Sequence, residues 1–231
     1  MVRFIKDNFV TSLLKYQAYV VILNKYEKFN FAKGFKKLKK PFFLTIKSRY
    51  KINKQDQKKI QINFFSKLIK FQKKYKSNLP LIYKSRLAKK KDFTMIKKIA
   101  LENSSNSRFV KDKLFSKKFR KYFRYFWLNN FFKKKRGNYL IVCNYKKNIL
   151  GFVLLLKKFN YYQIDLIVVK SSAQNKGVGK SLINYINNHF LSSGSKLIAG
   201  TQLDNDKAIN FYKKNGFIRL KGAIYNYHIH S

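Results

Sequence analysis

The chain has 231 residues, of which 45% are hydrophobic and 17% aromatic, enough to bury a sizeable core and to exclude global disorder. Its 53 lysine and arginine residues face 9 aspartate and glutamate residues, a formal net charge of +44. This charge favours polyanion binding, but the lysines are spread along the whole chain, and abundant Lys, Asn, Ile, Phe and Tyr are typical of AT-rich codons. We therefore expect attraction to nucleic acid at low salt, without a specific nucleic-acid site.

A single cysteine, Cys143, permits no internal disulfide and provides no cysteine cluster for a metal. It fits a reducing compartment, and we expect no metal cofactor. No apolar run reaches the length that spans a bilayer, and Lys15 interrupts any signal-like apolar segment. These features predict a cytoplasmic protein without a membrane span.

The first part of the chain holds one of the nine glycines, Gly34, and is difficult to interpret. The elements predicted here are strands at residues 18–23 and 42–48 and, between them, an amphipathic helix at residues 26–39. Pro80 and the lysine run 89–91 mark a boundary near residue 88. We therefore expect an N-terminal α/β region of unassigned role at residues 1–88 and a second domain at residues 89–231.

The second part has a clearer pattern. Asp92 is expected to cap a helix with Ile96, Ile99 and Ala100 on one face. The predicted elements that follow are a helix at residues 117–132, strands at 139–145, 149–157 and 161–169, a helix at 178–190, a strand at 197–201, a helix at 205–214, and a closing hairpin at 217–230. The three consecutive strands predict an antiparallel meander. The whole order predicts a mixed α/β (α+β) fold.

Residues 174–179, Gln-Asn-Lys-Gly-Val-Gly, follow a predicted strand and precede a predicted helix. Glycines let successive backbone N–H groups turn toward one point, and a helix start adds a positive dipole end, so a phosphate group would bind here. Lys176 and Lys180 would add charge, and Ser181 a hydroxyl. An ordinary helix-capping turn is the alternative. A P-loop is excluded because Gln174 stands where its first glycine belongs, and a dinucleotide-binding fold because the loop follows a meander.

A second motif at residues 205–217 has the pattern Asn-x-x-Ala-x-x-Phe-Tyr-x-x-x-Gly-Phe. Asn205 is expected to begin a helix, Tyr212 to lie two turns along it, and Gly216 to end it. Together, the two motifs resemble the signature regions of the GCN5-related N-acetyltransferase (GNAT) family. The resemblance covers residues 92–231.

The resemblance implies the GNAT fold: a central mixed, mostly antiparallel sheet with a splayed strand pair, flanked by helices. Residues 1–88 would add an N-terminal α/β half, conceivable as a degenerate copy of that fold without its motifs. The strands at 161–169 and 197–201 would form a V-shaped cleft for the pantetheine arm of acetyl-CoA, the co-substrate.

The resemblance also assigns site residues. The backbone of Ile167, Val168 and Val169 would bind pantetheine and polarise the thioester carbonyl. The pyrophosphate would bind the N–H groups of Gln174, Asn175, Lys176, Gly177, Val178, Gly179 and Lys180. Asn205 would contact the CoA arm, and Tyr212 would protonate the leaving thiolate as general acid. The general base stays open between His228, Asp165 and a water molecule.

The acceptor would be a primary amine that attacks the thioester directly. The segments 107–109, 127–130, 200–202 and 225–228 look like those of enzymes that acetylate nucleotide-linked 4-amino-4,6-dideoxy sugars, the dTDP-fucosamine acetyltransferase group, which implies a role in surface-glycan synthesis. On this reading Arg108, Gln202 and His228 contact the acceptor. The alternatives are acetylation of a protein N-terminus or lysine, and a basic nucleic-acid-binding protein on the same scaffold. A homodimer is left open.

Overall fold

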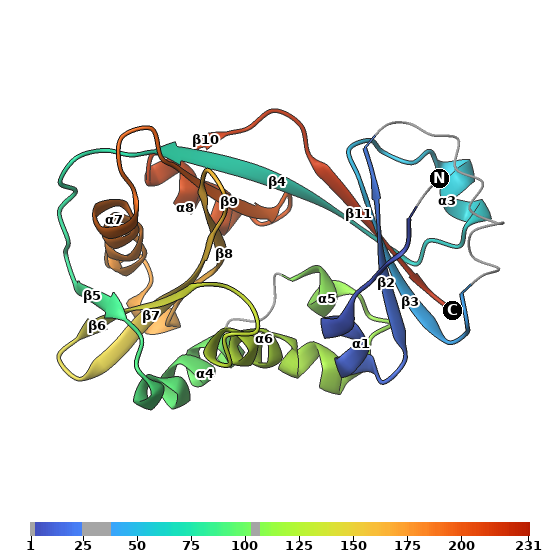
Figure 1. The fold of residues 1–231 in the computed structure, drawn as a ribbon, viewed down its shortest axis with the longest axis horizontal. Helices are drawn as coiled ribbons and strands as arrows, with labels where there is room; N and C mark the ends of the chain where they lie inside the picture. The colour runs from blue at the N-terminus through green and yellow to red at the C-terminus, as the bar shows by residue number, and fades with distance from the viewer. Residues whose placement is uncertain (1–2, 25–37, 103–106) are drawn as a thin grey trace.

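One mixed sheet of eleven strands runs through the protein in a computed structural model that describes residues 3–24, 38–102 and 107–231 (Figure 1). The strands are β1 Ile5–Lys6, β2 Gln17–Leu23, β3 Phe42–Ser48, β4 Phe64–Lys74, β5 Lys84–Leu87, β6 Tyr139–Tyr145, β7 Asn148–Lys157, β8 Tyr162–Val169, β9 Lys196–Gln202, β10 Ile218–Arg219 and β11 Ile224–His230. The strand order is β1-β2-β3-β11-β4-β9-β8-β7-β6-β5, and β10 pairs separately with β4.

Helices cover both faces of this sheet (Figure 1). They are α1 Asn8–Leu14, α3 Lys54–Lys59, α4 Phe93–Glu102, α5 Arg108–Lys111, α6 Lys117–Phe132, α7 Val178–Phe190 and α8 Asp206–Lys214, with short 3-10 turns η1 Lys90–Asp92 and η2 Ser171–Ala173. The mixed α/β fold class is thereby confirmed. The helix predicted at residues 26–39 falls almost wholly outside the described residues. Within the described residues, no helix has the length and apolar character needed to cross a membrane.

The predicted meander is confirmed, since β6, β7 and β8 pair antiparallel in sequence order. Strand β8 then pairs with β9 in parallel, but only from Tyr162–Leu197 to Ile164–Ala199. The strands separate where Asp165 forms a bulge, because Leu154 and Leu155 of β7 pair with Leu166 and Ile164 and skip the residue between them. An extra residue bends its strand and ends pairing, so the bulge explains the splay.

The predicted closing hairpin at residues 217–230 is wrong. Strand β10 pairs with β4 through Ile218 and Gln72, whereas β11 inserts between β3 and β4 and pairs with both. The eleven-residue β4 is long enough to take both partners at different positions along its length. Figure 1 shows β4 spanning from the half that holds β9 to the half that holds β11. Strands from both sides of residue 88 therefore belong to one sheet.

The capping role predicted for Asp92 holds in part, since it caps the 3-10 turn η1 that leads into α4 and not α4 itself. Its carboxylate accepts hydrogen bonds from both terminal nitrogens of Arg86, at 2.7 and 3.0 Å, and from the backbone N–H of Lys89 at 2.7 Å. These donors hold the side chain at the end of the 3-10 turn, before α4 starts. The face of α4 was predicted correctly, since Ile96, Ile99 and Ala100 are buried.

Two apolar cores fix the sheet from opposite faces. The first contains α7, whose Leu182, Ile183 and Ile186 are fully buried against β4 and β6–β9. The second contains α4 and α6 and packs against the other face of β6–β8. The aromatic face of α6 continues into a further cluster, where Phe119 and Phe123 pack with Phe43 of β3 and Phe109 of α5. Of the four aromatics at helical spacing on α6, Phe119 and Phe123 are core residues, whereas Tyr122 and Phe126 are only partly buried.

Candidate active site

The glycine loop leads from β8 through η2 into α7. Asn175 and Gly177 have left-handed backbones, with φ of 61° and 84°, and Gly177 is the N-cap of α7. The cap makes no side-chain hydrogen bond. Because the first N–H groups of a helix have no intrahelical acceptor, those at the start of α7 remain available for an anionic ligand. The exposed Lys176 and Lys180 flank them.

The second motif packs directly on this loop. A Cβ built on Gly179 would lie 2.5 Å from the ring of Phe211 in α8, closer than side chains can approach. Only glycine permits this contact, so the start of α7 and the middle of α8 lie against each other. The two motifs recognised in the sequence are thus neighbours in the fold, and Tyr212 follows the residue that makes the contact.

Tyr212 is buried, with its ring centroid 5.5 Å from that of Phe71 in β4 and 5.2 Å from that of Phe217. Burial raises the pKa of Tyr212 above its usual value, because the phenolate would lose its hydration. The phenol is therefore protonated at neutral pH. This is the form that a proton donor needs.

The cleft strands leave backbone groups open where they separate. Ile167, Val168 and Val169 pair with β7 on one edge, and on the other edge β9 is no longer a partner beyond Ile164. The side chain of Val168 is buried in the core, so only its backbone is offered to the cleft. Gln174 folds back from the loop, and its Nε2 donates to the carbonyl oxygen of Val169 over 3.3 Å.

Two of the predicted CoA contacts are used inside the protein. The hydroxyl of Ser181 is fully buried and accepts the backbone N–H groups of Ile82 and Tyr83, so the expectation that it binds phosphate is corrected. Asn205 caps α8 by accepting from Ala208, and its amide nitrogen donates to Thr201 at 3.1 Å. Asn205 therefore fixes the joint between β9 and α8.

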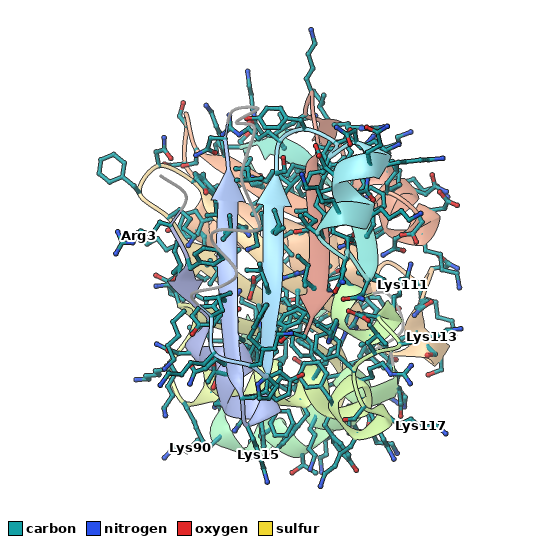
Figure 2. All side chains as sticks on the ribbon, turned by 90° about the vertical axis from the view of Figure 1, so that its right-hand side faces the viewer. Arg3, Lys15, Lys90, Lys111, Lys113 and Lys117 are labelled. Carbon is teal, nitrogen blue, oxygen red and sulfur yellow. The ribbon has the colours of Figure 1, made fainter. Side chains whose placement is uncertain are left out.

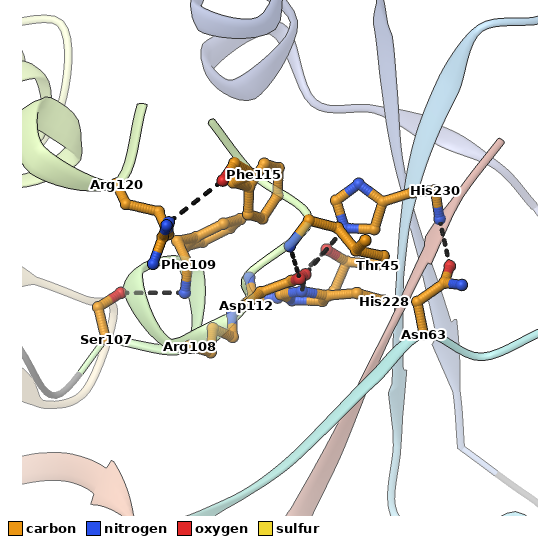
Figure 3. A network of polar contacts seen from close by, with 11 residues as sticks. Thr45, Asn63, Ser107, Arg108, Phe109, Asp112, Phe115, Arg120, His228 and His230 are labelled. Atoms are coloured by element: carbon orange, nitrogen blue, oxygen red, sulfur yellow. Dashed lines mark hydrogen bonds and ion pairs between the residues drawn. The ribbon is translucent and has the colours of Figure 1, made fainter. Parts of the chain in front are cut away.

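A network of polar side chains lies over β3 and β11 (Figure 3). One terminal nitrogen of Arg108 lies 3.2 Å from the hydroxyl of Thr45 and 2.7 Å from Nε2 of His228. On the other side of the ring, Nδ1 of His228 lies 2.7 Å from Oδ2 of Asp112. The same carboxylate oxygen is 2.8 Å from Nε2 of His230.

The protons of this network are fixed by chemistry. Because a guanidinium can only donate, Nε2 of His228 accepts from Arg108, and the ring proton lies on Nδ1 and is donated to Asp112. Burial lowers the pKa of His228 to about 3, so its ring is neutral. Burial alone would raise the pKa of Asp112, but the hydrogen bonds from His228 and His230 outweigh it and hold that pKa below its usual range.

Neither protein residue proposed as general base is free for that role. His228 is fully buried, and its only basic nitrogen already accepts from Arg108. Asp165 accepts two hydrogen bonds from Arg136, both at 3.0 Å, and one from Nε1 of Trp127 at 2.7 Å. These two expectations are corrected. Gln202 differs, since its buried Oε1 has no hydrogen-bond partner among the residues that the structure describes.

Sequence reasoning missed Asp112 and His230. The ligand atoms of Asp112, His228 and His230 lie within 4.8 Å of one another, a grouping that could hold a metal ion. The positive guanidinium of Arg108 at His228 opposes a cation there, and the hydrogen bonds satisfy the three groups without one. The His-x-His pattern on one strand face was the available signal, but nothing local pointed to Asp112.

Comparisons with known proteins concern the family and the fold of the chain. The model of the Acetyltransferase (GNAT) family matches residues 100–217, which is 118 of the 231 residues. A search of the curated proteins finds no match. Among solved structures, a functionally unknown conserved protein from Staphylococcus epidermidis is similar with a TM-score of 0.71 and 12% identity, over 93% of this chain and 85% of that one.

Two further solved structures are described as GNAT acetyltransferases. The one from Novosphingobium aromaticivorans has a TM-score of 0.54 and 9% identity, over 83% of this chain and 75% of its own. The one from Colwellia psychrerythraea has a TM-score of 0.52 and 14% identity, over 82% and 65%. At these identities the likeness concerns the fold, and the family match over more than half of the sequence decides membership. The chain belongs to the GNAT family of acetyltransferases, which use acetyl-CoA.

Proposed function

We propose that this protein transfers the acetyl group of acetyl-CoA directly to the primary amine of a small molecule. The observation that supports this proposal is the contact between Gly179 and Phe211, which holds the open start of α7 against the helix that carries Tyr212. Both lie beside the bulge-splayed strands β8 and β9. One site thus combines an anion-binding helix start, an open strand edge and a buried phenol.

The proposed roles follow this arrangement. The N–H groups of residues 174–180, assisted by Lys176 and Lys180, bind the pyrophosphate of CoA. The open backbone of Ile167 to Val169 binds the pantetheine arm and polarises the thioester carbonyl. Asn205 acts by holding the joint between β9 and α8. Residues 89–231 would form the catalytic domain, with residues 1–88 as its N-terminal part.

In the proposed reaction, the amine nitrogen attacks the carbonyl carbon of the thioester and forms the C–N bond. The C–S bond then breaks, and its electron pair leaves on the sulfur of CoA. Tyr212 donates its proton to this thiolate, and the proton lost by the amine passes to water, since His228 and Asp165 are engaged elsewhere. No covalent enzyme intermediate is needed, so Cys143 has no role in the chemistry.

For the acceptor, we propose the 4-amino group of a nucleotide-linked deoxy-amino sugar. The residues assigned to this acceptor come from separate parts of the sequence, yet two of them are in contact, since Arg108 donates to His228. The third, Gln202, ends β9 next to β4. A peptide amine is the competing acceptor. Turnover with each kind of acceptor distinguishes the two.

The test measures thiol release from acetyl-CoA with amino-sugar nucleotides and with peptides as acceptors. We expect turnover with the sugars, and activity with peptides alone would overturn the sugar assignment. Tyr212→Phe should lower turnover about 100-fold while acetyl-CoA affinity stays unchanged, because the ring packing is kept and only the proton donor is lost. Tyr185→Phe, which removes a hydroxyl from α7, is the matched control and should keep full activity. Unchanged turnover in Tyr212→Phe would remove this residue from its role.

A further inference from the structure

The face of the sheet beneath α5 forms a polar floor that extends from the cleft to the N-terminal strands. In the strand register, Thr45 pairs with His228, and Lys47 pairs with Asn226. Asn226 in turn pairs with Ser66 of β4. Because side chains alternate along a strand, Lys47 points to the same face as Thr45, which contacts Arg108. Lys47 therefore lies in the row next to Arg108.

These two cations, like Lys73 and Arg124, differ from the exposed charges of the surface. Figure 2 shows Arg3, Lys15, Lys90 and others projecting outward into solvent. Lys47 and Arg108 instead lie inside the fold, and burial lowers the pKa of both, that of Arg108 to about 10, so Arg108 is still charged at neutral pH. Each also keeps a solvent-accessible part. Both side chains are therefore partly buried and still reachable from solvent.

Among the residues described, neither cation is in direct contact with a carboxylate, although Asp7 attracts both of them and Asp112 attracts Arg108 from a greater distance. Within the described residues, no carboxylate forms an ion pair with Lys47 or Arg108. Arg108 donates through one terminal nitrogen, to Thr45 and His228. Its Nε and other terminal nitrogen make no hydrogen bond to the described part of the chain. Two recessed cations without a carboxylate in contact leave room for an anion that would pair with both directly.

The sheet face between these cations and the β8–β9 cleft also holds polar atoms without a hydrogen-bond partner. Oγ of Ser66 and Oε1 of Gln202 are buried without a hydrogen-bond partner in the described ranges, a condition that is rare unless water or a ligand is bound. Lys111 of α5 bonds to Asp204 beyond β9 at 2.6 Å, which holds α5 beside the cleft. Three strand spacings, roughly 14 Å in total, separate β3 from β9, a distance that long side chains shorten.

We propose that the acceptor carries an anionic group, a phosphate or a carboxylate, and that Lys47 and Arg108 bind this group while the amine lies at the β8–β9 cleft. This inference rests on the proposed acetyl transfer and adds Lys47 as a residue that determines specificity. The guanidinium is already oriented by Thr45 and His228, so its free edge can form paired hydrogen bonds to an oxyanion.

The test compares acceptors that differ only in charge: an amino sugar, its phosphate ester and its uronic acid, each with acetyl-CoA. We expect the charged acceptors to have at least about tenfold higher kcat/KM than the neutral sugar, and the better of the two anions identifies the group. Lys47→Met should remove most of this preference and leave the KM for acetyl-CoA unchanged. Lys59→Met, an equal charge change at an exposed position of α3, should keep it.

Equal use of charged and neutral sugars by the wild type, or equal losses in the two lysine variants, would overturn the inference. Failure of acetyl-CoA to bind would instead refute the proposed function. If no sugar is acetylated, calorimetric titration of the CoA-saturated protein with inorganic pyrophosphate decides: a site lost in Lys47→Met but kept in Lys59→Met supports the inference, and the same binding in both variants contradicts it.

Discussion

The two sides of the cleft are built by different means. The side assigned to CoA consists of backbone groups from two short motifs, held by glycine contacts such as that of Gly179 with Phe211. The side assigned to the acceptor consists of charged side chains far apart in sequence, such as Arg108 and His228, 120 positions apart. The comparison teaches that the first side depends on backbone conformation and the second on buried charge. Each should therefore respond to a different kind of change.

Removing Asp112 should give the largest effect. Asp112→Ala leaves His228, His230 and, through His228, Arg108 without their shared carboxylate inside the protein. We expect a loss of about 3 kcal/mol in the free energy of unfolding, because breaking a buried charged network leaves uncompensated groups. Urea denaturation measures it, and Asp112→Asn, which keeps the shape, should lose less. A loss under about 1 kcal/mol would show that the network contributes little to stability.

Lowering the pH should give the second-largest effect, a loss of stability on the acceptor side. In the unfolded chain a histidine takes up a proton as the pH falls through about 6.5, whereas His228 in the fold does so only at about 3. The unfolded state therefore binds more protons in this window, and the free energy of unfolding should fall by a few kcal/mol from about pH 6.5 down to about pH 3. The depressed pKa of Asp112 extends the loss at the lower end.

Urea denaturation at a series of pH values measures this fall. His189→Gln, at an exposed histidine of α7 for control, should show the same slope as the wild type. A free energy of unfolding that stays level between about pH 6 and about pH 4 would mean that His228 takes up its proton without leaving the fold.

The smallest expected effect concerns the CoA side alone. Gly177→Ala and Gly194→Ala each place a Cβ at a left-handed backbone, with φ of 84° and 81°. At Gly194 no described residue beyond its chain neighbours lies within 4 Å of this Cβ, so about 1 kcal/mol of stability should be lost, whereas at Gly177 the Cβ would lie 2.6 Å from Cδ1 of Ile82, so the loss should be larger. Only Gly177 caps α7. We expect acetyl-CoA affinity to fall about tenfold, or about 1.4 kcal/mol, in Gly177→Ala and to be unchanged in Gly194→Ala. Equal affinities by calorimetry would remove the loop from the CoA site.

Elements with local signals were predictable from the sequence, whereas pairings between distant segments were not. Helix α6 begins and ends where its periodicity indicated, Lys117 to Phe132, because Ser116 caps it and Phe119, Phe123 and Phe131 are buried along it. The meander was predicted because its turns are short. The pairing of β10 and β11 could not be predicted, since their partner β4 lies about 150 residues earlier.

The site residues divide in a similar way. The loop at residues 174–179 and the α8 motif were recognisable because glycine and spacing are local signals. The phosphate-binding role of Ser181 and the general-base role of His228 failed because their hydrogen-bond partners, Tyr83 and Arg108, come from distant segments. Lys47 was not recognised at all, since nothing local distinguishes a lysine that points inward from the many that do not.

The position of β11 has a consequence for how the protein folds as it is synthesised. Strands β3 and β4 leave the ribosome long before residues 224–230, yet β11 is the strand that joins them. Until it is made, both strands have an unpaired edge, which in folding intermediates invites association with other chains. The nascent chain is thus most exposed to aggregation just before its sheet closes, and a chaperone that shields strand edges would act in that interval.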